Sequence, residues 1–231
     1  MFWFDPYYLI FMAPAFILMM LAQWYVSSAF RKWSRVPVRT GLSGAEAAER
    51  LIRHAGLYGV TIEMTGGMLS DHYDPRNKVL RLSPGVYQGR SVASVAVAAH
   101  ELGHALQDQE GYAALRLRTA MVPAVNFGSY LGWILILLGL FLHLTNLAVV
   151  GLVIFSLGAV FALITLPVEF NASARAKRLL QTAGIVQTED EARGVNTVLN
   201  AAALTYVAAL ITAVMQVLYY ALLIFGDRRR R

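Results

Sequence analysis

A pattern near the middle of the chain has the spacing of a metal site, because His100, Glu101 and His104 form H-E-x-x-H. In a helix of about 3.6 residues per turn, positions four apart lie on one face, so both imidazoles can bind one metal ion. Glu101 then points beside the metal, where its carboxylate can take a proton from water and pass it to a leaving amine. The pattern therefore predicts peptide-bond hydrolysis at a zinc centre, with Glu101 as the catalytic residue.

A catalytic zinc needs a third protein ligand and an open position, and the chain has no cysteine. No histidine lies between His104 and His143, and His143 is expected on the far side of the membrane. A carboxylate remains, and Glu169 is the strongest candidate because it follows an apolar segment that returns to the side of the two histidines. Pro167 suits a helix start and would place Glu169 in the first turn. The weaker candidates are Glu110, Asp71 and Asp74.

The composition is that of a membrane protein. Of 231 residues, 57% are hydrophobic and 15% are charged, against about 25% charged in ordinary soluble domains. The net charge is +6, but the basic residues flank apolar segments and form no stripe interleaved with aromatic residues. We therefore expect the lipid bilayer as a partner and no nucleic acid.

Four apolar segments are long enough to cross a bilayer core of about 30 Å. They are residues 6–29, a hairpin over 123–166 with a turn at 143–146, and 201–225. No basic residue precedes the first segment and several follow it, which favours a retained anchor over a cleaved signal peptide. Charge next to the spans predicts a multi-pass protein of the inner (plasma) membrane with its polar parts in the cytoplasm. The arginines at 228–231 conflict with this orientation if the last segment crosses fully.

Two polar blocks, residues 40–118 and 167–200, must position the chemistry. The first is the expected cytoplasmic catalytic part, and the second carries the third-ligand candidate and a helix that begins at Thr188. The elements predicted in the first block are a helix from Ser43 to Ala55, strands at 60–64 and 79–82, and a helix over 91–109. The expected fold is mainly α and integral to the membrane, with about four transmembrane helices and a small α+β, zincin-like (gluzincin) catalytic part.

Several of these motifs carry a resemblance to a known family. The sequences H-E-L-G-H, E-F-N-A-S, S-D-H-Y-D-P and L-R-L-S, with the four apolar segments, resemble the YugP-type bacterial membrane zinc metallopeptidases over nearly the whole chain. A looser similarity links the chain to the HtpX and Ste24 membrane proteases, where a Glu that begins an E-x-x-A-D motif completes the site. The matching residue here is Glu169. The Asp of that motif, expected to hold a ligand His, is replaced by Ser173, which can form a hydrogen bond but adds no charge.

The resemblance also implies that the strand Val79–Leu82 is an edge strand beside the active-site helix, to which an extended substrate adds. His72, Arg175 and Tyr206 are candidate donors to the oxyanion. Expected substrates are proteins or peptides near the membrane, and no oligomeric state is predicted. The alternatives are a zinc hydrolase of lipid-linked substrates and an inactive or non-proteolytic scaffold or quality-control component. The intact Glu101 argues against the scaffold, and manganese or cobalt would also suit these ligands.

Overall fold

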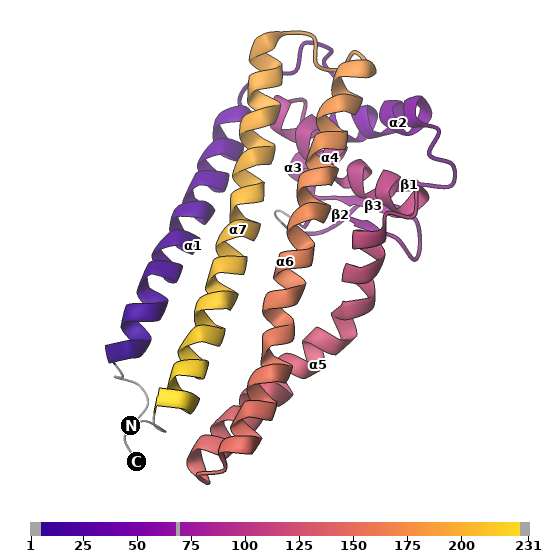
Figure 1. The fold of residues 1–231 in the computed structure, drawn as a ribbon. Coiled ribbons are helices and arrows are strands. Elements are labelled where there is room, and N and C mark those ends of the chain that lie inside the picture. The colour runs from indigo at the N-terminus through magenta and orange to yellow at the C-terminus, as the bar shows by residue number, and fades with distance from the viewer. Residues whose placement is uncertain (1–5, 68–69, 227–231) are drawn as a thin grey trace. The chain divides into compact units, whose positions relative to one another are not determined.

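The computed structural model describes residues 6–67 and 70–226 (Figure 1). Its elements in chain order are α1 (Pro6–Trp33), α2 (Gly44–Ala55), β1 (Thr61–Met64), β2 (His72–Asp74), β3 (Val79–Leu82), α3 (Pro84–Tyr87), α4 (Val92–Gln109), α5 (Ala113–Phe141), α6 (Thr145–Thr182) and α7 (Glu189–Gly226). The chain divides into two compact units. The sheet unit comprises Gln23–Leu115 and Val168–Leu204, and the span unit comprises Met1–Ala22, Arg116–Pro167 and Thr205–Arg231.

The span unit is made of helices only, within the described residues. Helices α1, α5, α6 and α7 are each long and apolar enough to cross a membrane. In the α5–α6 hairpin the backbones approach closely at Gly139, where an added Cβ would overlap the backbone nitrogen of Ala148. Beside this hairpin, α1 and α7 are joined by an edge-on contact between Tyr8 and Tyr219, with ring centroids 5.1 Å apart. The predicted fold class, a mainly helical membrane protein with four spans and a small α+β part, is confirmed.

The long helices extend further than the sequence indicated. Pro167 was expected to begin a helix, but it lies inside α6, so that prediction is wrong and Glu169 lies in a helix interior. A proline removes one backbone donor, and the alanine-rich segment that follows continues the helix. The predicted helix from Thr188 and the span at 201–225 are likewise one helix, α7, with Thr188 capping its start. The arginines at 228–231 lie outside the described residues.

The sheet unit packs α2 and α4 against a three-stranded sheet. Ser43 and Glu46 form the predicted capping box at the start of α2. Small side chains, including Ala47 and Ala99, are fully buried where the helices pack, together with Leu80 from the sheet. The strand order is β1-β3-β2, with β1 parallel and β2 antiparallel to β3.

This strand order corrects the prediction about the edge strand. Strand β3, at Val79–Leu82, pairs on both sides, so among the described strands the edges are β1 and β2. Strand β2 was not predicted, because a polar segment of three residues shows no alternation of apolar and polar positions. Its register sets His72 opposite Arg81 and Tyr73 opposite Leu80.

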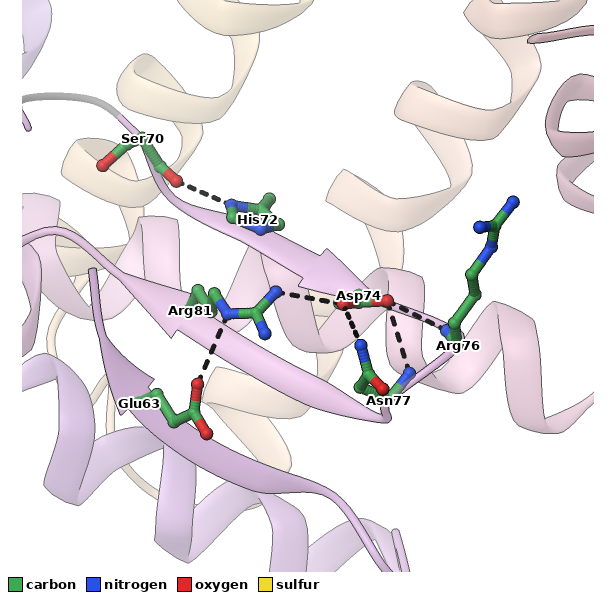
Figure 2. Close-up of polar contacts among 7 residues, drawn as sticks. All are labelled: Glu63, Ser70, His72, Asp74, Arg76, Asn77 and Arg81. Atoms are coloured by element: carbon green, nitrogen blue, oxygen red, sulfur yellow. Dashed lines mark hydrogen bonds and ion pairs between the residues drawn. The ribbon is translucent and has the colours of Figure 1, made fainter. Parts of the chain in front are cut away.

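Polar side chains join the three strands on the exposed face of the sheet (Figure 2). Arg81 of β3 contacts Glu63 of β1 at 3.3 Å and Asp74 of β2 at 3.0 Å. Asp74 also accepts hydrogen bonds from Asn77 and from the backbone nitrogen of Arg76 in the following turn. The Asn77 amide and the Arg81 guanidinium hold the pKa of the Asp74 carboxyl below its usual range. Exposed ion pairs contribute little to stability, so the main role of this network is to hold strand register.

Candidate metal centre

Helix α4 positions both histidines of the H-E-x-x-H pattern as the sequence predicts. The rings of His100 and His104 lie edge to face, with centroids 5.0 Å apart. Each side chain is 12% exposed, so both rings are largely shielded from water yet still accessible from one side. The helix is rich in buried alanine on its other faces, which fixes its position against the rest of the sheet unit.

Glu169 of α6 completes the cluster. Its Oε2 lies 3.2 Å from Nε2 of His100 and 3.5 Å from Nε2 of His104, and its side chain is 2% exposed. Ligand atoms of the three residues all lie within 4.8 Å of one another. Two imidazole nitrogens and a carboxylate oxygen, converging in a largely buried site without thiolates, suit zinc and leave a fourth position open. The residues present therefore fit the metal that the motif implies.

The close approach of α4 to α6 depends on a residue that sequence reasoning did not single out. A Cβ on Gly103 would lie 2.5 Å from the carbonyl oxygen of Ala172 and 3.0 Å from its Cα. Only glycine allows this backbone contact, which lies one residue before His104 and three residues after Glu169. Gly103 therefore sets the distance between the two helices that carry the ligand atoms.

The Nδ1 atom of each histidine ring has a defined hydrogen-bond partner. Ser173 Oγ lies 3.1 Å from Nδ1 of His100, and Gln107 Oε1 lies 3.0 Å from Nδ1 of His104. Ser173 thus contacts the candidate ligand His100, as the matching Asp is expected to do in the HtpX and Ste24 proteases, but through a neutral hydroxyl. Both Nε2 atoms face Glu169, which leaves these nitrogens directed toward the position of a metal.

Glu101 is half-buried on α4 and connects the cluster to the edge of the sheet. Its Oε2 accepts a hydrogen bond from the backbone N–H of Tyr73 in β2, at 3.1 Å. Burial raises the pKa of the Glu101 carboxyl, although the neighbouring histidines oppose this effect. A carboxylate whose affinity for protons is raised by burial is suited to proton transfer near neutral pH.

The other carboxylates considered as third ligands are engaged elsewhere. Asp71 accepts hydrogen bonds from the backbone and hydroxyl of Ser83, at 2.7 and 3.0 Å. Asp74 belongs to the network on the exposed face of the sheet. Glu110 pairs with Arg175 at 2.6 Å, and this contact lowers the pKa of the Glu110 carboxyl. Of these carboxylates, the structure brings Glu169 to the two histidines.

Of the candidate oxyanion donors, Arg175 and His72 belong to the sheet unit and have different surroundings. The guanidinium of Arg175 is half-buried and contacts both Asn171 and Glu110. His72 lies with Arg81 on the exposed face of the sheet (Figure 2), opposite to the face toward which the neighbouring Tyr73 points. Tyr206 belongs to the span unit, so its role as a donor stays a prediction.

Fold and cluster together define a class: helical membrane proteins that carry a potential His/His/Glu metal site on two packed helices. Comparison with known proteins gives the particular family. A family model described as "Putative neutral zinc metallopeptidase" matches residues 8–225, and the chain belongs to this family. The chain is also 47% identical over 207 residues to "Putative membrane protease YugP" of Bacillus subtilis (strain 168), which covers 90% of this chain and 92% of the relative.

The family match and this relative confirm the resemblance drawn from the motifs, and the family implies zinc as the metal. No solved structure matches the chain significantly.

Proposed function

We propose that the chain is a membrane zinc endopeptidase of the gluzincin type, in which His100, His104 and Glu169 bind the metal and Glu101 is the general base. The observation that carries the proposal is the convergence of three ligand atoms within 4.8 Å, next to the half-buried Glu101 on the helix that carries both histidines. Membership in a family of zinc metallopeptidases supports the same assignment. The cluster lies wholly within the sheet unit.

Each residue of the site has a separate task. Zinc bound to this cluster would polarise a substrate carbonyl and lower the pKa of a water molecule toward about 7. Glu101 removes a proton from that water and later gives it to the leaving amine, so the peptide bond breaks between a new carboxylic acid and a free amine. The hydrogen bond from Tyr73 to Oε2 fixes the carboxylate and leaves its other oxygen for the proton.

The position of strand β2 supports a role in substrate binding that the resemblance had implied for Val79–Leu82. Backbone groups of successive residues in an antiparallel strand point alternately to either side. Because the N–H of Tyr73 donates to Glu101, the backbone of this residue faces away from β3 and toward the open edge. This contact already occupies the N–H of Tyr73, so an extended peptide would lie along this edge next to Glu101 without a hydrogen bond from Tyr73, and its carbonyl groups would come near the metal site.

The substrates we propose are proteins or peptides at the cytoplasmic face of the inner (plasma) membrane. Glu169 follows the apolar residues 147–166 on one continuous helix, which supports a site close to the bilayer surface. Arg31, Lys32 and Arg35 follow the first span, as basic residues do on the cytoplasmic side. The relative named as a membrane protease supports this substrate class.

The proposal is tested with the detergent-solubilised protein, a Glu101→Gln variant and a matched control, Glu49→Gln, at an exposed position of α2. We expect about one zinc per chain in all three proteins, measured after removal of loosely bound metal. Cleavage of unfolded casein should fall by at least about 100-fold in Glu101→Gln alone. Zinc-free protein from all three preparations would refute the metal site. Equal cleavage by Glu101→Gln and the parent would refute the role of Glu101.

A further inference from the structure

Gln107 is a buried polar residue that the peptidase chemistry does not use. It lies one turn after His104 on α4, and no part of the residue is exposed to solvent. A buried amide that lacks hydrogen bonds is costly, so its partners show what the position is for. Its nitrogen donates to the carbonyl oxygen of Val168 at 2.8 Å and to Oδ1 of Asn171 at 3.0 Å. Its oxygen lies 3.0 Å from Nδ1 of His104.

These contacts determine which way the amide points. The carbonyl of Val168 can only accept, so the atom of Gln107 that faces it must be the nitrogen. Both amide protons are then used by Val168 and Asn171, and the atom that faces His104 must be the oxygen. An amide oxygen can only accept, so Nδ1 of His104 must carry a proton. The proton of the neutral imidazole is therefore on Nδ1, and Nε2 keeps the lone pair that a metal needs.

The orientation of Asn171 is fixed in the same way from its other side. Arg175, one turn further along α6, donates from Nε to Oδ1 of Asn171 at 2.6 Å. A guanidinium can only donate, so the atom that it contacts must be the amide oxygen. Arg175 is held in turn by Glu110, at the end of α4, at 2.6 Å. The hydrogen bonds thus form a directed chain from an ion pair at the surface to a histidine of the cluster.

We propose that Gln107 is a positioning residue that fixes the tautomer and ring orientation of His104 for metal binding, and that Asn171, Arg175 and Glu110 hold Gln107 in its orientation. This inference rests on the proposed metal site and adds a set of residues that act through His104. These hydrogen bonds connect α4 to α6 at two places, Gln107 and Glu110. They therefore also couple the His104 ring to the helix that carries Glu169.

The two histidines are held by different chemistry. His100 contacts the hydroxyl of Ser173, which can rotate and either donate or accept a hydrogen bond. His104 contacts an amide whose orientation its other partners determine. Gln107 therefore specifies one tautomer, whereas Ser173 accommodates either. For this reason we expect the metal affinity to depend more strongly on Gln107 than on a typical buried polar residue.

The variants are chosen to separate positioning from folding. In Gln107→Leu the new side chain has a volume similar to that of glutamine but no polar atoms. Asn171→Leu removes the oxygen that accepts hydrogen bonds from Gln107 and Arg175. Asn171→Asp keeps an acceptor for both Gln107 and Arg175. Gln109→Leu, at an exposed position of the same helix, is the matched control. Zinc affinity is measured by competition with a chromophoric chelator, and the melting temperature of each metal-free protein is recorded in parallel.

We expect Gln107→Leu to bind zinc about 10- to 100-fold more weakly than the parent, the range that partners of metal-ligating histidines typically command. Asn171→Leu should be about tenfold weaker, while Asn171→Asp and Gln109→Leu should stay within about threefold of the parent. A folded Gln107→Leu protein with the affinity of the parent would overturn the proposal. If Gln107→Leu does not fold, equal affinities for Asn171→Leu and Asn171→Asp would overturn it.

A second measurement needs no variant at the positioning residues. In metal-free parent protein labelled with ¹⁵N-histidine, at a pH above the end of the measured titration of His104, the shifts of its two ring nitrogens report the tautomer. His104→Gln identifies the signal. We expect the proton on Nδ1, and a proton on Nε2 would overturn the inference. If the proton is on Nδ1 but the parent binds no zinc, the hydrogen-bond assignment stands and the proposed metal site fails.

Discussion

Replacing Gly103 by alanine would test whether backbone contact between α4 and α6 sets the geometry of the metal site. The added Cβ would lie 2.5 Å from the carbonyl oxygen of Ala172, whereas ordinary contact begins at 3.4 Å. Both contacting groups belong to helix backbones, so no side chain can rotate away. The helices must therefore separate by about 0.9 Å, or α4 must rotate, to relieve the overlap.

A displacement of this size exceeds what a zinc site tolerates. Metal–ligand distances in proteins vary by about 0.2 Å, and Glu169 lies three residues before Ala172 on the helix that would move. We therefore expect Gly103→Ala to weaken zinc binding by at least about tenfold. Overpacking of this kind also costs about 1–3 kcal/mol of stability. Both effects arise from one methyl group that contacts neither the metal nor a substrate.

The assay compares zinc affinity and the denaturant midpoint of Gly103→Ala with those of the parent and of Gly85→Ala. Gly85 lies in α3, where an added Cβ would meet nothing within 4 Å, so this control should match the parent in both measurements. A Gly103→Ala protein with unchanged midpoint and zinc affinity within about twofold of the parent would show that the helices are not in contact at this residue. The reasoning about ligand spacing would then be refuted.

Two further substitutions separate metal binding from the support of Glu101. Glu169→Gln replaces the carboxylate by a poor ligand and should weaken zinc binding by more than about 100-fold. The helical circular dichroism should stay unchanged. Retention of tight zinc binding would exclude Glu169 as a ligand. Tyr73→Phe removes the hydrogen bond from the phenol to Asp108, 3.0 Å long. Burial raises the pKa of this phenol and Asp108 raises it further, so it stays a donor throughout the assay range. We expect Tyr73→Phe to lose about 1 kcal/mol of stability and to cleave several-fold more slowly, with unchanged zinc content. The control Tyr58→Phe, at an 88% exposed position, should match the parent. Equal stability and cleavage in the two variants would exclude a role of the Tyr73 phenol in holding β2 and its contact with Glu101.

The sequence contained the ligand spacing but not the contacts that support it. His100 and His104 could be placed on one face because helical periodicity is local, and Glu169 could be favoured because it follows a span. Gln107 gave no signal, because a glutamine in a helix usually lies at the surface, and only the fold shows that α6 buries it. Gly103 likewise gave no indication of the contact between α4 and α6, since a glycine within a helix predicts only weaker helix formation.

The two errors in the fold both concern features that tertiary structure decides. Pro167 was interpreted from a local rule about helix starts, and the strand Val79–Leu82 was placed at an edge because the resemblance implied it. Tertiary packing overrides the first, because contacts with α4 hold α6 in a helix beyond the proline. The second could not be decided locally, because whether a strand is central or at an edge depends on strand β2, which has only three residues.

The charge of the site gives a reason for Ser173 where the related proteases carry an aspartate. At Nδ1 both histidines contact neutral groups, Ser173 and Gln107, and the carboxylate in contact with both rings is that of Glu169. In the proposed site, two neutral imidazoles and one carboxylate around Zn²⁺ would leave a net positive charge, which would favour release of a proton from water to Glu101. A carboxylate at position 173 would push electron density toward the metal through His100 and reduce this effect, while it strengthened metal binding. In the proposed site the neutral hydroxyl would therefore favour water activation over affinity, and Gln107 would maintain the ring geometry that affinity requires.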